Sequence, residues 1–223
     1  MVSNVTLYYV AEYSSGNIHK FTDDWTHISS KSYNFPNSII AIGNNLLISS
    51  ASIITKTDSN INALIQYSGN STYQGLFYNP ANNLIYAAAY SENAVHIFNS
   101  TLYLTTSISV LPETTPLSIA GYNNQIYVGM RYSGNIVVIS KSNQIINIFD
   151  VCNSAAIWIS SIVFDQFGLM ATSCSTNKQL NLFYSNQSYT GKSLSSPRLT
   201  YSIGYDSKER FIIVSYGAVD IWF

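Results

Sequence analysis

The chain has 223 residues, of which 47% are hydrophobic and 14% aromatic, while only 9% are charged and the formal net charge is −1. A chain of this length and apolar content can bury a sizeable core, which argues against wholesale disorder. Nucleic acids and anionic membranes are bound by clustered Lys and Arg, so the near-neutral charge argues against either partner.

The N-terminus shows no sign of a targeting segment. The stretch MVSNVTLYYVAEY alternates like a β-strand and lacks the apolar core of a signal peptide. No apolar run approaches the roughly 20 residues that a membrane-spanning helix needs. We expect no membrane partner, and a secreted form of this chain would require that a leader has been removed or omitted.

A short apolar strand recurs along the whole chain. Its copies begin at residues 7, 46, 84, 126, 169 and 211, so neighbouring copies lie 38 to 43 residues apart. The most complete unit is residues 116–149, where four runs of alternating apolar residues are separated by Asn123-Asn124, residues 133–135 and residues 141–143. These separators tolerate the positive φ angles of tight hairpins. The pattern predicts four antiparallel strands per unit.

Units of about 40 residues with four strands each are typical of β-propeller blades, which pack against their neighbours around a common axis. We predict a single all-β domain over residues 1–223, folded as a six-bladed β-propeller. The repeat units extend over about residues 5–37, 38–71, 72–114, 115–154, 155–197 and 198–223. No first strand precedes Leu7 and no fourth strand follows Phe223, so the first and last blades are predicted to be incomplete.

A turn that begins with tyrosine follows several of the recurring strands, and the next strand ends in an apolar or aromatic residue. This combination of strand, turn and aromatic close resembles the NHL and YVTN propeller repeats over the whole chain. The chain departs from the NHL pattern after the turn asparagine, where Ile18, Ala94 and Ile136 replace an arginine. The resemblance implies a propeller that serves as a binding platform, an extracellular module or an enzyme, and the fold alone does not choose among these uses.

Four N-glycosylation sequons are present, at Asn4, Asn70, Asn99 and Asn186. Glycans hydrate a surface without adding charge, which would explain how the surface of a chain with only 9% charged residues stays hydrated. We therefore predict a secreted, N-glycosylated extracellular protein. The alternative is coincidence, because a chain rich in Asn and Ser contains some sequons by chance.

The two cysteines, Cys152 and Cys174, are too few for a disulfide scaffold and match no zinc-binding spacing. Cys152 precedes the first strand of the fifth unit and Cys174 ends its second strand, so antiparallel pairing brings both to one face. We predict a disulfide between them. The alternative is a pair of small buried side chains.

No constellation of residues points to a catalytic site. Lactonase-type propellers hold a divalent cation at their centre, but the inner strands of this chain begin without a carboxylate. His19, His27 and His96 are expected to be exposed or half-exposed strand residues with no Ser, Cys or acidic partner. Asp23-Asp24 is expected to be a solvated hairpin loop. We therefore expect no metal, no cofactor and no enzymatic activity.

The best candidate for a binding surface is the tyrosine-bearing turn. Turns after the second strands of antiparallel sheets lie on one face of the disc, so Tyr13, Tyr90, Tyr132 and Tyr216 are predicted to share that face. Tyrosine offers a flat, amphipathic contact area that suits glycan or protein recognition. The alternative is that each tyrosine packs against an adjacent blade and each turn asparagine caps its own turn.

These features predict a non-catalytic, extracellular, glycosylated β-propeller that acts as a binding or structural module. The alternatives are a carbohydrate-binding lectin propeller and a propeller hydrolase of the lactonase type. Residues 217–223 form an apolar edge, and exposed edges pair with other strands. A protein partner, self or other, would add a strand there and build a fibre or oligomer; the alternative is that the sequence is a piece of a longer protein.

Overall fold

The chain folds almost entirely into β-strands and tight turns, in a computed structural model that describes residues 7–152, 157–184, 186–195, 198–205, 209–215 and 218–222. The strands are β1 (Leu7–Glu12), β2 (Asn17–Thr22), β3 (His27–Ser32), β4 (Pro36–Ile42), β5 (Asn45–Ser50), β6 (Ile53–Thr57), β7 (Ala63–Ser68), β8 (Tyr73–Asn79), β9 (Leu84–Ala89), β10 (Ala94–Asn99), β11 (Leu104–Ser109), β12 (Pro116–Tyr122), β13 (Gln125–Met130), β14 (Asn135–Ile139), β15 (Ile145–Asp150), β16 (Ile159–Phe164), β17 (Met170–Cys174), β18 (Gln179–Phe183), β19 (Tyr189–Ser195), β20 (Thr200–Tyr205), β21 (Phe211–Ser215) and β22 (Ala218–Trp222). Two 3₁₀ turns, η1 (Tyr90–Glu92) and η2 (Ser175–Asn177), follow β9 and β17. Across the described ranges no helix is long and apolar enough to cross a membrane.

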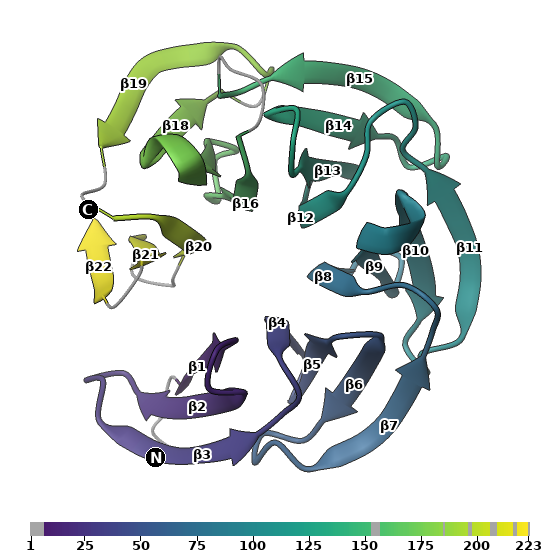
Figure 1. Cartoon of the computed structure of the whole chain (residues 1–223), viewed down its shortest axis with the longest axis vertical. Helices are drawn as coiled ribbons and strands as arrows, with labels where there is room; N and C mark the ends of the chain where they lie inside the picture. The colour runs from purple at the N-terminus through teal and green to yellow at the C-terminus, as the bar shows by residue number, and fades with distance from the viewer. Residues whose placement is uncertain are drawn as a thin grey trace.

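The strands form six antiparallel sheets, each made of strands that are consecutive in the chain. The first sheet, β1–β3, and the last, β20–β22, have three strands; the four between them, β4–β7, β8–β11, β12–β15 and β16–β19, have four. Figure 1 shows the sheets following one another around a common centre, with the first strand of each sheet nearest to it and the last strand on the rim. This arrangement is a β-propeller.

The number of blades depends on how the two end sheets are counted. Four sheets have the four strands of a complete blade. The three-stranded sheets count either as two parts of one divided blade or as two incomplete blades, which gives five or six blades in total. The all-β propeller prediction is therefore confirmed, and the first and last sheets lack a strand among the described residues, as predicted. Counted as one divided blade, these two sheets give five blades and not the six that were predicted.

Hydrophobic clusters fill the junctions between consecutive sheets. The described residues form five such clusters, one at each junction from the first sheet to the last. Between β8–β11 and β12–β15, for example, Tyr86 and Ile97 share a buried cluster with Ile119 and Val128. Among the described residues, no cluster joins the last sheet to the first. Burial of these apolar faces therefore stabilises the ring through five junctions.

The hairpin turns follow the local signals in the sequence. Asn123 and Asn124, which connect β12 to β13, have φ angles of 49° and 60°. Two consecutive positive φ angles match the right-handed twist of the flanking strands, and asparagine tolerates them better than most residues. The pairing of Tyr122 with Gln125 across this turn sets the register of the whole β12–β13 hairpin. Asn143 and Gly134, in the next two turns of the same sheet, also have positive φ angles, of 62° and 70°.

One junction packs backbone against backbone, and this leads to a stability prediction. A Cβ atom added to Gly75 on β8 would lie 2.8 Å from the backbone nitrogen of Ile119 and 3.0 Å from the Cα of Ser118, both on β12. Backbone atoms cannot rotate away, so we expect Gly75→Ala to lower the free energy of unfolding by about 1–3 kcal/mol. Urea unfolding followed by fluorescence measures the change.

Gly204 on β20 supplies the matched control for that substitution. A Cβ atom there would meet its nearest neighbour, Ile212 Cβ, at 4.0 Å, which is an ordinary contact. We therefore expect Gly204→Ala to change the free energy of unfolding by no more than about 0.5 kcal/mol. Equal effects of the two substitutions would show that the close approach of β8 and β12 is not what requires glycine at position 75.

Candidate functional site

Three aromatic side chains meet around one arginine, and the four residues come from turns and connections of three consecutive sheets. The guanidinium carbon of Arg131 lies 4.1 Å from the ring centroid of Trp158, 5.2 Å from that of Tyr132 and 5.4 Å from that of Tyr90. Arg131 Nη1 also donates a 2.5 Å hydrogen bond to the Tyr90 hydroxyl. We call Tyr90, Arg131, Tyr132 and Trp158 the arginine cluster. Tyr132 is 48% exposed and Trp158 37%, so the cluster presents aromatic surface to solvent.

A backbone contact repeated in three sheets positions the cluster. The residue after the second strand donates its N–H to the carbonyl of a residue just before the first strand of the same sheet. The three pairs are Tyr90 to Thr72 (3.0 Å), Arg131 to Thr115 (3.1 Å) and Ser175 to Trp158 (2.9 Å). The turns after second strands and the connections between sheets are therefore fastened together on one face of the propeller.

The connection between β11 and β12 is held from both sides. The Thr115 N–H donates to Asn93 Oδ1 at 2.8 Å, from the turn after β9. On the other side, Ser133 Oγ in the turn after β13 and Asn135 Nδ2 at the start of β14 donate to the two carboxylate oxygens of Glu113 at 2.5 Å and 2.9 Å. These asparagines therefore bridge turns and connections, instead of only capping their own turns as the alternative interpretation expected.

Arg131 carries its charge without a carboxylate partner. Within the described part of the chain, the ion pairs join His19 to Glu12 and His96 to Glu92, and none includes Arg131. Its Nε atom is buried and makes no hydrogen bond. Burial raises the pKa of the Tyr90 hydroxyl, and the hydrogen bond and charge of Arg131 oppose that rise. The cluster is thus a cation held between aromatic rings, with no carboxylate paired to it among the described residues.

The structure brings together only part of the predicted tyrosine face. Tyr90 and Tyr132 are both in the arginine cluster. Tyr13, 57% exposed, instead lies 5.3 Å from the ring of Phe35. Tyr216 lies outside the described residues. Arg131 and Trp158 were not among the predicted binding residues, although Arg131 is one of only three arginines in the chain and directly precedes a tyrosine turn.

The prediction that His96 is an exposed residue without an acidic partner is wrong. His96 on β10 is only 4% exposed. Its Nδ1 lies 2.9 Å from the hydroxyl of the fully buried Tyr73, and its Nε2 lies 3.3 Å from Glu92 Oε2. Burial raises the pKa of Tyr73. The phenol and the imidazole share one hydrogen bond, in which one group donates and the other accepts. Both polar groups can therefore be buried in the sheet.

His19 is half-exposed, as predicted, but the expectation that it has no acidic or hydroxyl partner is wrong. Its Nε2 lies 3.0 Å from Glu12 Oε2, and its Nδ1 lies 2.9 Å from Ser30 Oγ. His27 Nε2 lies 2.8 Å from the same serine oxygen. One proton assignment satisfies all three contacts: His27 donates to Ser30, Ser30 donates to His19, and His19 donates to Glu12. This carboxylate–imidazole–hydroxyl chain has the connectivity that activates a serine nucleophile.

The acidic turn between β2 and β3 is exposed, as expected. Asp24 Oδ1 accepts hydrogen bonds from the hydroxyl of Thr22 and from the N–H of Thr26. These two contacts, the hydroxyl first, hold the pKa of Asp24 below its usual value. Over the described ranges, no group of three or more His, Cys, Asp and Glu side chains could hold a metal ion.

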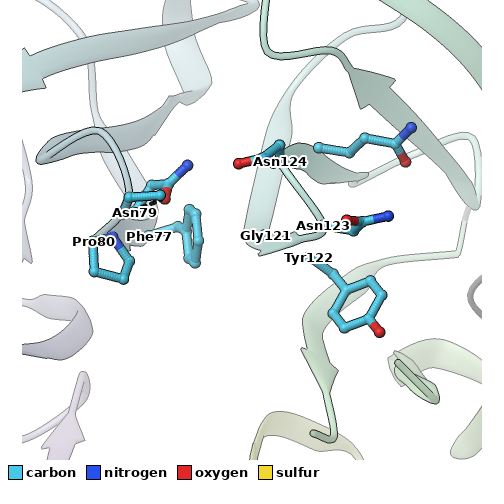
Figure 2. Close-up of a pocket in the computed structure, with 9 residues that line it drawn as sticks. Phe77, Asn79, Pro80, Gly121, Tyr122, Asn123 and Asn124 are labelled. Atoms are coloured by element: carbon cyan, nitrogen blue, oxygen red, sulfur yellow. Dashed lines mark hydrogen bonds between the residues drawn. The ribbon is translucent and has the colours of Figure 1, made fainter. Parts of the chain in front are cut away.

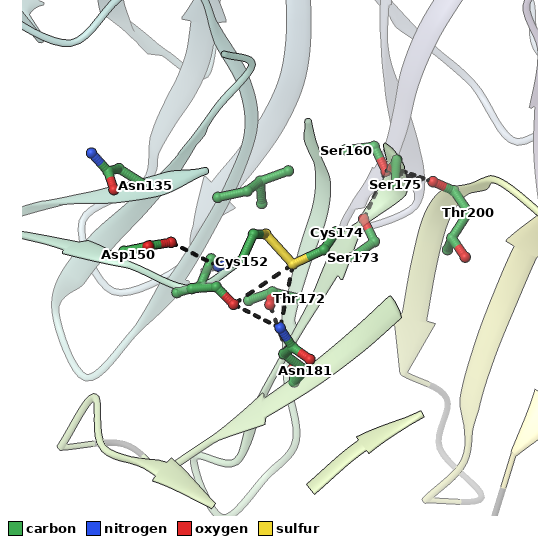
Figure 3. The surroundings of a disulfide bond; sticks show 12 residues. Asn135, Asp150, Cys152, Ser160, Thr172, Ser173, Cys174, Ser175, Asn181 and Thr200 are labelled. Carbon is green, nitrogen blue, oxygen red and sulfur yellow. Dashed lines mark hydrogen bonds between the residues drawn. A yellow bond between two sulfur atoms is a disulfide. The ribbon is translucent and has the colours of Figure 1, made fainter. Parts of the chain in front are cut away.

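Cys152 and Cys174 form a disulfide, the pairing that the sequence analysis predicted. Figure 3 shows it between the connection that follows β15 and the end of β17. Beside it, Asn181 Nδ2 donates a 2.7 Å hydrogen bond to the carbonyl of Val151. Cys174 is followed directly by Ser175, the residue that holds the Trp158 carbonyl, so the disulfide supports one side of the arginine cluster.

Among the sequon asparagines, Asn70 and Asn186 are exposed and Asn99 is half-buried. Asn99 is the last residue of β10 and Asn186 follows β18, the third strands of their sheets, and each uses only its Oδ1 atom in the hydrogen bonds of its turn. Their Nδ2 atoms, to which a glycan would be attached, take no part in those bonds. Asn4 lies outside the described residues.

Solved structures of other propellers resemble this fold. A streptogramin B lyase superposes with a TM-score of 0.78 at 11% identity, over 99% of this chain and 76% of the lyase. The virginiamycin B lyase of Staphylococcus aureus gives 0.75 at 12% identity, over 100% of this chain and 82% of that one. A protein of unknown function from Bacteroides caccae gives 0.78 at 12% identity, over 96% and 84%. No protein-family model and no curated protein matches the chain.

These comparisons correct one prediction and leave another without support. The expectation that the chain is not an enzyme is contradicted, because two of the similar propellers are lyases. At 11–12% identity the likeness shows the fold, and it transfers no activity from those proteins to this one. The NHL and YVTN resemblance is not confirmed, and the lactonase-type alternative has no better support.

Proposed function

We propose that this chain is a ligand-binding propeller whose arginine cluster recognises a glycan that bears a carboxylate. The observation that carries the proposal is the state of Arg131, a cation without a carboxylate partner among the described residues, lying over Trp158 at 4.1 Å. The guanidinium fork is suited to a planar carboxylate, and exposed aromatic rings stack on the apolar faces of sugar rings.

The low charge of the chain favours selective binding of anionic ligands at the arginine cluster. Only 10 Lys and Arg residues occur in 223, so no broad positive field competes with the cluster for anions. Recognition would then depend on contact geometry at Tyr132 and Trp158 in addition to charge. Such a ligand binds less tightly as ionic strength rises, because part of its attraction is electrostatic.

A paired comparison of acidic and neutral oligosaccharides tests the proposal. Calorimetric or NMR titration uses two pairs of ligands: 3′-sialyllactose with lactose, and an oligogalacturonide with a neutral cello-oligosaccharide. The difference within each pair measures the contribution of the carboxylate to binding. We expect at least one acidic oligosaccharide to bind more tightly than its neutral counterpart does at the same site. Equal binding within every pair, or none by any acidic glycan, would count against the proposal.

We further propose that the protein acts outside the cell and carries N-glycans on Asn70, Asn99 and Asn186. Material from the native source is expected to lose mass on treatment with a glycosidase specific for N-glycans. The variant Thr101→Ala retains Asn99 but removes its sequon, so it should lose one glycan and serve as the control for that site. An intact mass that the glycosidase leaves unchanged would remove the main argument for secretion.

Assembly through the C-terminal edge belongs to the same proposal. The sheets β1–β3 and β20–β22 each pack through their own hydrophobic cluster against a four-stranded neighbour. The outer strand β22 pairs only with β21 among the described strands. Addition of a strand from another chain at β22 would complete that sheet.

A second candidate function is acyl transfer at the first sheet, favoured by the hydrogen-bonded chain from Glu12 through His19 to Ser30. Ser30 Oγ would attack an ester carbonyl, His19 would take the serine proton and return it to the leaving alcohol, and water would release the acyl group. Hydrolysis of p-nitrophenyl acetate tests this. A rate that falls at least about 10-fold in both His19→Gln and Ser30→Ala supports it, whereas equal rates contradict it.

A further inference from the structure

A recess lies on the face opposite the arginine cluster, between the sheets β8–β11 and β12–β15. Its walls come from the turns that follow the first strands, β8 and β12, and those turns lie on the other side of the disc from the turns after second strands. The volume is about 380 Å³, within the range of small-ligand pockets. Figure 2 shows Phe77 and Asn79 on one side and Gly121 and Asn124 on the other.

The lining offers amides and aromatic rings but no charge. Its polar side chains include Asn79, Asn123, Asn124, Gln125 and the phenol of Tyr122, and none of the lining residues is Asp, Glu, Lys, Arg or His. Amides both donate and accept hydrogen bonds, as sugar hydroxyls do. A recess of this composition favours an uncharged, hydroxyl-rich ligand over an ion.

Much of this hydrogen-bonding capacity is unused within the protein. Asn79 Oδ1 accepts a bond from the Ala81 N–H at 3.0 Å, and Gln125 Oε1 accepts one from the Tyr127 hydroxyl at 2.8 Å. These two contacts orient both side chains and leave their amino groups available as donors. In the part of the chain that the structure describes, the side chains of Asn123 and Asn124 make no such bond, and both are exposed.

A close contact shapes the aromatic wall. A Cβ atom on Gly121 would lie 2.2 Å from the Phe77 ring, so only glycine allows the ring to lie against this backbone. Tyr122 is fixed from the other side by stacking on Phe164 at 5.1 Å between ring centroids. Flat rings held in place stack on the apolar face of a pyranose at little entropic cost.

We propose that this recess binds a neutral saccharide, with Phe77 as the stacking ring and the four amides as partners of the hydroxyl groups. This site is separate from the arginine cluster in place and in ligand chemistry. The two asparagines in the turn also have a local reason to be there, their positive φ angles of 49° and 60°. Glycine satisfies that local requirement at least as well, so the turn and the amides can be tested separately.

The decisive variant is Asn123→Gly combined with Asn124→Gly, which preserves the hairpin and removes two amides. The control is Asn44→Gly, in the corresponding turn between β4 and β5, which lines no part of the recess. Wild type and variants are screened by saturation-transfer NMR and titrated with methyl α-mannoside, methyl β-galactoside, N-acetylglucosamine and cellobiose. Thermal unfolding of each protein is measured in parallel.

We expect at least one of these sugars to bind wild type and Asn44→Gly alike, and to bind the double variant at least about 10-fold more weakly. The unfolding midpoints of all three proteins should agree. Arg131→Ala should leave this binding unchanged, which separates the recess from the proposed acidic-glycan site. Failure of all four sugars to bind wild type, or equal binding by the double variant, would overturn the inference.

Discussion

Removal of the disulfide is expected to lower the free energy of unfolding by about 3 kcal/mol. Cys152 and Cys174 are separated by 22 residues, and opening a loop of this size restores conformational entropy to the unfolded chain. The variant is Cys152→Ala combined with Cys174→Ala, which leaves no unpaired thiol. Both cysteines are almost completely buried, so part of the loss will come from the contacts of the sulfur atoms.

Redox conditions provide the control for this prediction. Urea unfolding of the wild type under oxidising conditions should require more denaturant than in dithiothreitol, while the double variant should unfold identically in both. The disulfide forms only in an oxidising compartment, so peptide mapping of native material without reduction also tests secretion. A wild-type midpoint that does not respond to reductant, or two free thiols in the native protein, would show that the bond does not form.

The fold was largely predictable because its signals are local. Alternation of apolar residues marks a strand within a few positions, and Asn123-Asn124 marks a hairpin without reference to the rest of the chain. The spacing of repeats then implied stacked sheets. The blade count depends on how the incomplete end sheets relate to each other, and no local pattern reports that relation.

The side-chain clusters were not predictable because they depend on register and on contacts between sheets. His19 lies directly opposite Ser30 in the β2–β3 pairing, and the register shifts between Lys20 and Phe21. A slip of one residue would place Ser30 on the other side of the sheet, away from His19. In the turn sequences Tyr132 aligns with Tyr90, whereas the backbone contacts make Arg131 the equivalent of Tyr90.

Replacement of Arg131 by alanine is expected to weaken the binding of an acidic glycan by about 10- to 100-fold, as expected for loss of a charge-assisted hydrogen bond. Arg131→Lys retains the charge but loses the planar fork that stacks on Trp158, so we expect its affinity to lie between those of wild type and Arg131→Ala. Titration with the acidic oligosaccharide that binds the wild type best measures all three proteins.

Lys141→Ala supplies the matched control, because it removes the same charge from an exposed turn between β14 and β15, on the opposite face of the propeller. It should bind the acidic glycan as the wild type does, apart from a small change that salt abolishes. Equal losses in Lys141→Ala and Arg131→Ala would indicate attraction by net charge alone. Undiminished binding by Arg131→Ala would place the acidic-glycan site elsewhere, because the stacked guanidinium is the feature of this face that selects a carboxylate.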